Sequence, residues 1–250
     1  MKNLLYILLF FPVCLFAQGT TSEPVNDLGG SFLDAFPLAT RPIALEVLKQ
    51  SDYMDRSMTC KLPNGETITA LLDDSLACDS FWRRVFDAVT VREICNVPFG
   101  SSYEKTKNIL QNKYGDYESL FSDKDRIIYR NKKYAGLDFN SMYFLFQSDG
   151  VNSYFNSAIF VIECETKADA MKEKALLDEK LNKKYIGFSV LNDVNEPYSI
   201  GGLAPIWSED GVDFGLHVDI IKYDTTNSLT KKRYGLRLVY GPYNYVKEDF

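Results

Sequence analysis

The side chains of this chain that could do chemistry begin with its one histidine. His217 stands two residues before Asp219, and Arg237 follows in the next segment of alternating polar and apolar residues. If the two segments pair as antiparallel strands, Arg237 lies beside His217 and Asp219. The trio is then either an acid–base site or ordinary cross-strand pairing on a wet sheet face. We favour pairing, because the sequence shows neither a nucleophile nor a substrate groove to accompany it.

Carboxylates are the second source of chemistry. Several acids stand next to each other or in turns, among them Asp73–Asp74, Glu163 with Glu165, and Glu209–Asp210. A glycosidase needs two acids held across a cleft, which their spacing in a sequence does not reveal. The sequence contains no nucleophile elbow, zinc-protease helix, phosphate-binding loop or EF-hand loop. We therefore expect no catalytic residue, no cofactor and no bound metal.

Aromatic side chains are abundant, with sixteen tyrosines and seventeen phenylalanines. Tyrosine combines a flat apolar body with a hydroxyl group, which suits contacts with proteins or sugars. Half-burial at a sheet edge is the other common fate of tyrosine. The residues that we predict to bind a partner border the last hairpin or follow it in the C-terminal segment: Trp207, Tyr223, Tyr240, Tyr243 and Tyr245.

Four cysteines follow the N-terminal segment, namely Cys60, Cys78, Cys95 and Cys164. No two of them form a C-x-x-C pair, which argues against a redox motif or a zinc knuckle. An even number in an exported chain permits two disulfides in three pairings. The alternative is four buried free thiols, because a chain of this size does not need covalent links to hold its core.

Residues 1–17 have the pattern of a signal peptide. Lys2 precedes an apolar run from Leu4 to Phe16, which is too short to span a bilayer. We predict export to the periplasm or the exterior, with membrane attachment only if Cys14 is lipidated. Without this segment the 28 basic residues become 27 against 34 acidic ones, a net charge of −7. An acidic chain without a basic run is a poor binder of nucleic acid.

The rest of the chain divides into three parts. Residues 18–40 read as a flexible lead-in, and 41–96 as an N-terminal segment with a hairpin about Asn64–Gly65 and a helix capped by Ser80. Residues 97–250 read as the main domain. It opens with a helix capped by Ser101, with Glu104 completing a capping box.

After this helix the pattern predicts three strands, a second helix opened by a Thr166–Asp169 capping box, and three or four further strands. Strands that cluster in runs, without alternating one-for-one with helices, favour an α+β fold with antiparallel sheet. The block of one helix and three strands repeats once in outline.

Three stretches of this domain carry a resemblance: Val97–Glu104, Tyr134–Gly136 and Phe144–Phe146. From about Ile94 to Tyr185 the chain resembles uncharacterised exported proteins of Gram-negative bacteria. More distantly, it is similar to the β-lactamase-inhibitor-protein-like fold, which implies protein binding through a sheet without catalysis. We therefore predict a non-enzymatic envelope protein that binds a protein or peptide through an aromatic-bearing sheet face. The alternative is a carbohydrate-binding module or a carboxylate-dependent glycoside hydrolase.

Overall fold

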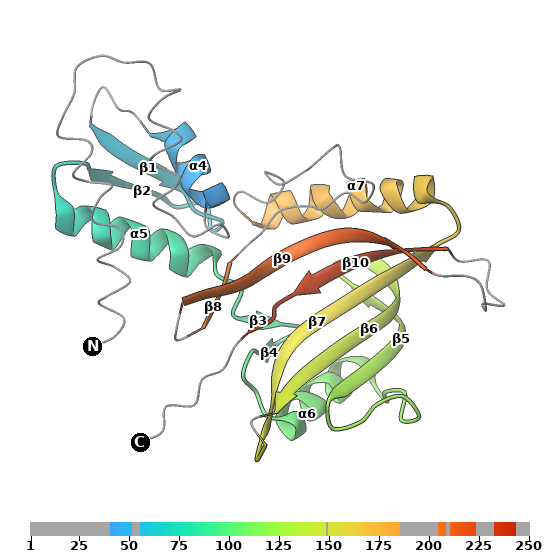
Figure 1. The fold of residues 1–250 in the computed structure, drawn as a ribbon. Helices are drawn as coiled ribbons and strands as arrows, with labels where there is room; N and C mark the ends of the chain where they lie inside the picture. The colour runs from blue at the N-terminus through green and yellow to red at the C-terminus, as the bar shows by residue number, and fades with distance from the viewer. Residues whose placement is uncertain are drawn as a thin grey trace.

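A computed structural model describes residues 41–51, 56–148, 150–185, 205–208, 211–223 and 233–243. The predicted signal peptide and lead-in lie outside these residues. The described chain has an α+β fold with antiparallel sheets, as predicted (Figure 1). Its elements are α4 (Arg41–Gln50), β1 (Ser57–Lys61), β2 (Thr67–Leu71), α5 (Ser75–Val89), β3 (Glu93–Ile94), β4 (Val97–Pro98), α6 (Tyr103–Tyr114), β5 (Arg126–Tyr134), β6 (Leu137–Ser148), β7 (Ser153–Cys164), α7 (Lys167–Lys184), β8 (Pro205–Ser208), β9 (Gly211–Lys222) and β10 (Tyr234–Tyr240).

The described chain has two separate hydrophobic cores. The first runs from Ile43 to Val89, and the second takes its first residue at Val91. The β3–β4 hairpin belongs to the second core, since Ile94 and Val97 are buried in it. The change of core therefore falls near residue 90, a few residues before the predicted boundary at 96.

The first core is built from the β1–β2 hairpin and the helices α4 and α5. The Asn64–Gly65 turn is confirmed: Gly65 has φ +87°, and the Glu66 amide donates to Asn64 Oδ1 at 3.0 Å. The helix α5 starts at Ser75, earlier than predicted, because Asp74 caps it by accepting from the Ala77 amide at 2.9 Å. Ser80 is thus an interior residue of the helix.

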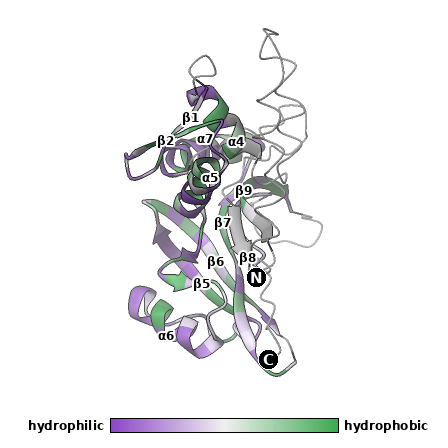
Figure 2. Ribbon diagram, turned by 90° about the vertical axis from the view of Figure 1, so that its left-hand side faces the viewer, coloured by the Kyte–Doolittle hydropathy of each residue, from purple (hydrophilic) through white to green (hydrophobic). Residues whose placement is uncertain are grey.

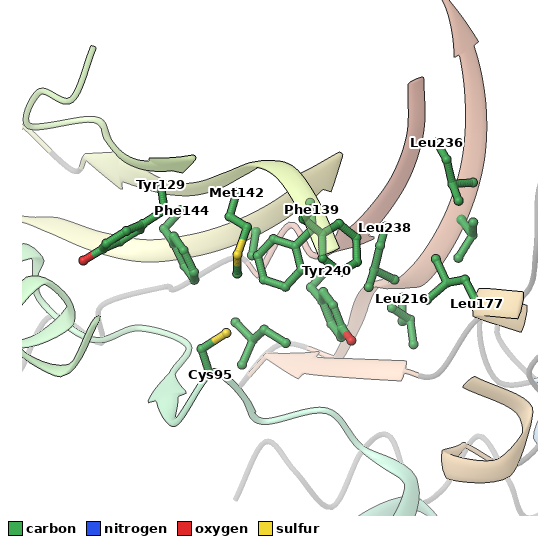
Figure 3. Packing of buried hydrophobic residues seen from close by; sticks show 14 of the residues in the cluster. Cys95, Tyr129, Phe139, Met142, Phe144, Leu177, Leu216, Leu236, Leu238 and Tyr240 are labelled. Carbon is green, nitrogen blue, oxygen red and sulfur yellow. The ribbon is translucent and has the colours of Figure 1, made fainter. Parts of the chain in front are cut away.

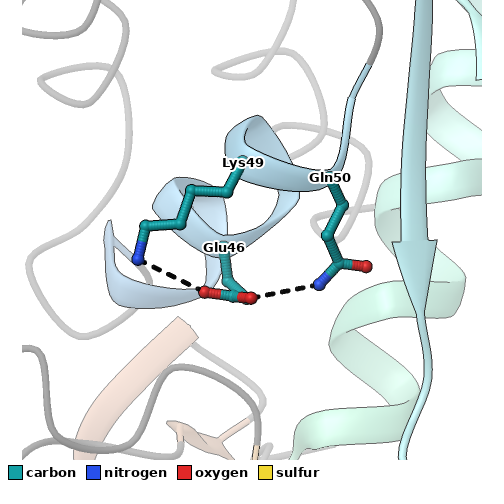
Figure 4. A network of polar contacts seen from close by, with 3 residues as sticks. All are labelled: Glu46, Lys49 and Gln50. Atoms are coloured by element: carbon teal, nitrogen blue, oxygen red, sulfur yellow. Dashed lines mark hydrogen bonds and ion pairs between the residues drawn. The ribbon is translucent and has the colours of Figure 1, made fainter.

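Side chains at the end of α4 attach this helix to β1. The Glu46 carboxylate accepts hydrogen bonds from Lys49 Nζ at 3.5 Å and from Gln50 Nε2 at 3.2 Å (Figure 4). The other atom of the Gln50 amide, Oε1, accepts from the Lys61 backbone at 2.8 Å, and Ser51 Oγ accepts from the Thr59 backbone at 3.1 Å. These two bonds satisfy the backbone amides of Thr59 and Lys61 on the side of β1 that does not pair with β2.

The main sheet has the strand order β5–β6–β7–β10–β9–β8, and every neighbouring pair is antiparallel. It consists of two meanders, β5–β6–β7 and β8–β9–β10, each preceded by a helix. The last strands of the two meanders, β7 and β10, pair at the centre. The repeat that the sequence shows in outline is therefore a structural repeat of one helix and three strands.

The helices α6 and α7 pack against one face of this sheet. Their buried residues, such as Leu110, Leu177 and Leu181, share one cluster with Phe144, Phe160, Leu236 and other inward side chains (Figure 3). The strands carry both hydrophobic and hydrophilic segments along their length (Figure 2). This alternation follows from the two-residue period of a strand and gives the sheet two chemically different faces.

The start of α6 differs from the prediction by one residue. Ser102 is the N-cap, and its hydroxyl accepts from the Lys105 amide at 3.4 Å. Ser101 is still extended chain, because its carbonyl accepts from the Phe155 amide at 2.7 Å. The pairing with β7 therefore decides where the helix begins. The Thr166–Asp169 capping box of α7 is confirmed, with Asp169 N donating to Thr166 Oγ1 at 3.1 Å.

One charged residue lies in the buried stripe of α7. Lys174 is 4% exposed and pairs with Asp178 one turn later. In the structure the ion pair itself is buried, so the stripe continues through it.

Candidate functional site: the outer face of the sheet

The candidate site is the sheet face opposite α6 and α7, here called the outer face. Its residues alternate along each strand with those of the core, and none of them belongs to either hydrophobic core cluster. Among the described helices, only α6 and α7 contribute to the core of the sheet, on the other face. The outer face includes Ile128, Arg130, Ser141, Tyr143, Ile159, Val161, Glu163, His217, Asp219, Tyr223, Gly235, Arg237 and Val239.

An apolar row crosses the outer face at right angles to the strands. Strand register places Ile128, Tyr143, Ile159 and Val239 side by side, and the row ends at His217. Neighbouring strands are about 4.8 Å apart, so the five residues span about 19 Å. Ile128 and Val239 are buried, whereas Tyr143 and Ile159 are half-buried and reach the surface.

The next row is polar and contains an ion pair. It runs from Arg130 through Ser141, Val161 and Arg237 to Asp219. Arg237 Nε donates to Asp219 Oδ1 at 2.9 Å, and a second nitrogen of the guanidinium donates to Oδ2. This two-bond geometry neutralises both charges and raises the pKa of Arg237. The predicted neighbourhood of Arg237 and Asp219 is confirmed.

His217 lies beside this ion pair and is half-buried. Burial lowers its pKa, the charge of Asp219 opposes that shift, and the charge of Arg237 adds to it. The environment therefore favours the neutral imidazole. Asp219 is bound by Arg237 through two hydrogen bonds. This fits the cross-strand pairing that we favour from the sequence.

Tyr223 covers a glycine in the middle of a strand. A Cβ atom at Gly235 would lie 2.3 Å from the Tyr223 hydroxyl and 2.8 Å from Cζ, so the tip of the ring rests directly over Gly235. Glycine is needed here to let the ring approach the backbone. Burial, followed by the charges of Glu163 and Tyr143, raises the pKa of Tyr223 to about 12. Tyr223 thus joins the outer face, as an aromatic side chain above the sheet.

The prediction for Tyr240 is wrong. Tyr240 is 1% exposed and lies in the core with Leu236 and Leu238, because all three alternate onto the face that α7 covers. Its hydroxyl is 3.3 Å from that of Tyr134, and burial raises its pKa well above the usual range. A side chain in this position has no surface to offer a partner.

Among the remaining predicted aromatic residues, only Tyr243 has a described side chain. Tyr243 is half-buried and stacks on Phe99 at 5.9 Å between ring centroids, and its backbone amide donates to the Asn156 carbonyl at 2.8 Å. Trp207 lies on β8 opposite Val212, but its side chain is outside the described part of the structure. Tyr245 is outside the described residues.

Cys60, Cys78, Cys95 and Cys164 are all buried thiols, which corresponds to the second of the two sequence-based alternatives. Cys60 and Cys78 lie in the first core, and Cys95 and Cys164 in the second. Burial raises the pKa of Cys60 and of Cys95 to about 11. A thiol with so high a pKa is a poor nucleophile, because the thiolate is the reactive form.

Sequence reasoning missed two outer-face residues, Tyr143 and Glu163. The alternation of β6 and β7 places them opposite the core, but only strand pairing brings them to the same face as Tyr223 and Arg237. The lone Gly235 in an apolar strand was the available indication, since such a glycine often marks the close approach of another group.

Within the residues that the structure describes, no three histidine, cysteine or acidic side chains come together as metal ligands would. No described helix is both long and apolar enough to cross a bilayer. Comparison of the chain with family models, with curated proteins and with solved structures gave no match.

Proposed function

We propose that this chain is an exported, non-enzymatic binding protein that holds a protein or peptide partner of the cell envelope against the outer face of its main sheet. The observation that carries the proposal is the composition of that face. Half-buried Tyr143 and Tyr223 stand beside aliphatic residues and an arginine whose charge is already neutralised by Asp219. Tyrosine and arginine are among the residues most enriched at the centres of protein interfaces.

Binding through the face is favoured over binding along the β5 edge. The Ile128 amide donates to Ser122 Oγ at 2.9 Å, and its carbonyl accepts from the Glu118 amide at 2.9 Å. Arg126 exchanges two backbone bonds with Asp123 at 3.0 and 3.2 Å. The loop before β5 therefore occupies the backbone groups of Arg126 and Ile128 that an added strand would need in the first half of this edge.

Carbohydrate binding is the second candidate, because a tyrosine ring held over a sheet also suits contact with a sugar. Hydrolysis has less support. Glu163 and Asp219 lie two strands and one row apart, about 12 Å between their Cα atoms. Asp219 is also bound by Arg237. A glycan array with the full chain tests this candidate, and binding that the Tyr143→Ala/Tyr223→Ala variant loses would favour it over the protein partner.

Site-specific photo-crosslinking tests the protein-binding proposal. A photoreactive phenylalanine analogue is placed at position 143 on the outer face, or at exposed Lys172 on α7 as the control. We expect a discrete adduct in cells from position 143 alone. The purified partner should then bind Tyr143→Ala/Tyr223→Ala about 10- to 100-fold more weakly than the unchanged chain.

A tyrosine outside the outer face supplies the matched control. Tyr117 is half-buried in the loop after α6, and Tyr117→Ala should leave the affinity for the partner unchanged. Equal adducts from positions 143 and 172, or a purified partner that binds the double variant as well as the unchanged chain, would refute the proposal.

A further inference from the structure

Glu163 is an acidic side chain of the outer face, near the end of the central strand β7. It lies on β7 opposite Gly235 of β10, the residue that the Tyr223 ring covers. Its own backbone amide donates to Asn140 Oδ1 at 2.8 Å, which fixes the strand at this point. The carboxylate is half-buried, and its charge contributes to the raised pKa of Tyr223. Glu163 and the phenol of Tyr223 are therefore immediate neighbours.

The charge of Glu163 is not balanced within the described part of the chain. The cation in the neighbouring polar row is Arg237, and two of its nitrogen atoms donate to Asp219. Arg233 lies just before β10, where its amide donates to the Cys164 carbonyl at 3.0 Å, but no ion pair joins its side chain to Glu163. Glu163 takes part in none of the salt bridges of the described residues.

We propose that Glu163 and Tyr223 form a subsite for a cationic side chain, a lysine or an arginine, of the bound partner. The inference rests on the proposed function, since it names the chemistry of the partner at the same face. A cation beside Glu163 would gain an opposite charge together with the aromatic ring of Tyr223. An anion would meet Glu163 directly and find the charge of Arg237 already taken, so the subsite discriminates by sign.

Short peptides of one design test the sign preference. The probes are a seven-residue serine–leucine peptide with a central lysine, the same peptide with norleucine as the uncharged analogue of lysine, and the same peptide with glutamate. Binding to the full chain is followed by NMR of ring-labelled tyrosines, with Tyr143→Phe and Tyr223→Phe to assign the two resonances. We expect the lysine peptide to shift the Tyr223 resonance and to bind about three- to tenfold more tightly than the norleucine peptide.

Two charge variants and a matched control complete the experiment. Glu163→Gln should remove the preference for lysine, whereas Glu93→Gln, an exposed acid on β3, should keep it. Arg233→Gln should strengthen binding of the lysine peptide, because it removes a like charge from the chain beside the end of β7. If Glu163 only stabilised the fold, Arg233→Gln would not strengthen binding of the lysine peptide.

The failures of the two proposals are distinguishable. If all three peptides shift the Tyr143 and Tyr223 resonances with equal affinity, or if Glu163→Gln keeps the lysine preference, the cationic subsite is refuted while binding at the outer face stands. If no peptide shifts either resonance, both the subsite and the peptide-binding role of the face are contradicted.

Discussion

Gly235 gives the sharpest test of the outer face, because its role is steric. It lies in the interior of β10 and is not among the glycines with positive φ, so the backbone there accepts any residue. A Cβ atom would nevertheless lie 2.3 Å from the Tyr223 hydroxyl and 3.2 Å from Ile221 Cγ1. Gly235→Ala must therefore displace the ring of Tyr223 from the sheet.

The cost follows from the area that the ring covers. A tyrosine side chain offers about 200 Å², of which a half-buried ring hides about 100 Å². Exposing half of that hidden area costs about 1.2 kcal/mol at about 25 cal/mol per Å². Replacing a strand glycine by alanine returns about 0.5 kcal/mol of backbone entropy. The free energy of unfolding should therefore fall by about 0.7 kcal/mol, or about 2 °C in Tm.

A double-mutant cycle isolates this contact. In a Tyr223→Ala background the Cβ at position 235 no longer meets the ring, so Gly235→Ala should raise stability by about 0.5 kcal/mol. The coupling between the two positions is then about 1.2 kcal/mol, measured by urea unfolding followed by circular dichroism. If Gly235→Ala has the same effect in both backgrounds, the ring does not rest over Gly235 and the description of the outer face is wrong.

Three further predictions concern the cap of α6, the buried ion pair and the histidine. Ser102→Ala should lower the free energy of unfolding by about 1 kcal/mol, because Ser102 caps the helix. Ser101→Ala should lower it much less, because Ser101 Oγ is buried without a hydrogen bond. If urea unfolding gave the reverse order, Ser101 would be the cap, as the sequence predicts. Lys174→Met should lower the free energy of unfolding by about 3 kcal/mol, because it leaves Asp178 as an unpaired buried charge, and adding Asp178→Leu should restore most of this loss. A loss of less than about 1 kcal/mol for the single variant would contradict burial of the pair. Because the pKa of His217 is lowered in the folded chain, this histidine is protonated at a higher pH in the unfolded chain than in the folded chain. The contribution of His217 to stability is therefore fully present above about pH 6.5 and is lost as the pH falls below that value. His217→Gln should lose less stability than the unchanged chain between about pH 7.5 and about pH 5.5, and an equal loss would show that burial of His217 is not responsible.

The sequence by itself determined the fold class and most elements. Hydrophobic period and local chemistry are properties of neighbouring residues, so they identify β9 and β10, the Asn64–Gly65 turn and the capping box of α7 without tertiary information. The facing of Leu216, Val218 and Ile220 toward the core also follows from alternation alone.

Only the tertiary structure decided which side chains share a surface. Alternation groups Tyr240 with Leu236 and Leu238 on the core side, but only the pairing of β9 with β10 places the ring of Tyr223 over Gly235. The outer face joins Tyr143 and Glu163 to Arg237 because β7 pairs with β10 across about 75 residues of intervening chain. The physical reason is that contacts between distant strands depend on register, which no local pattern of residues encodes.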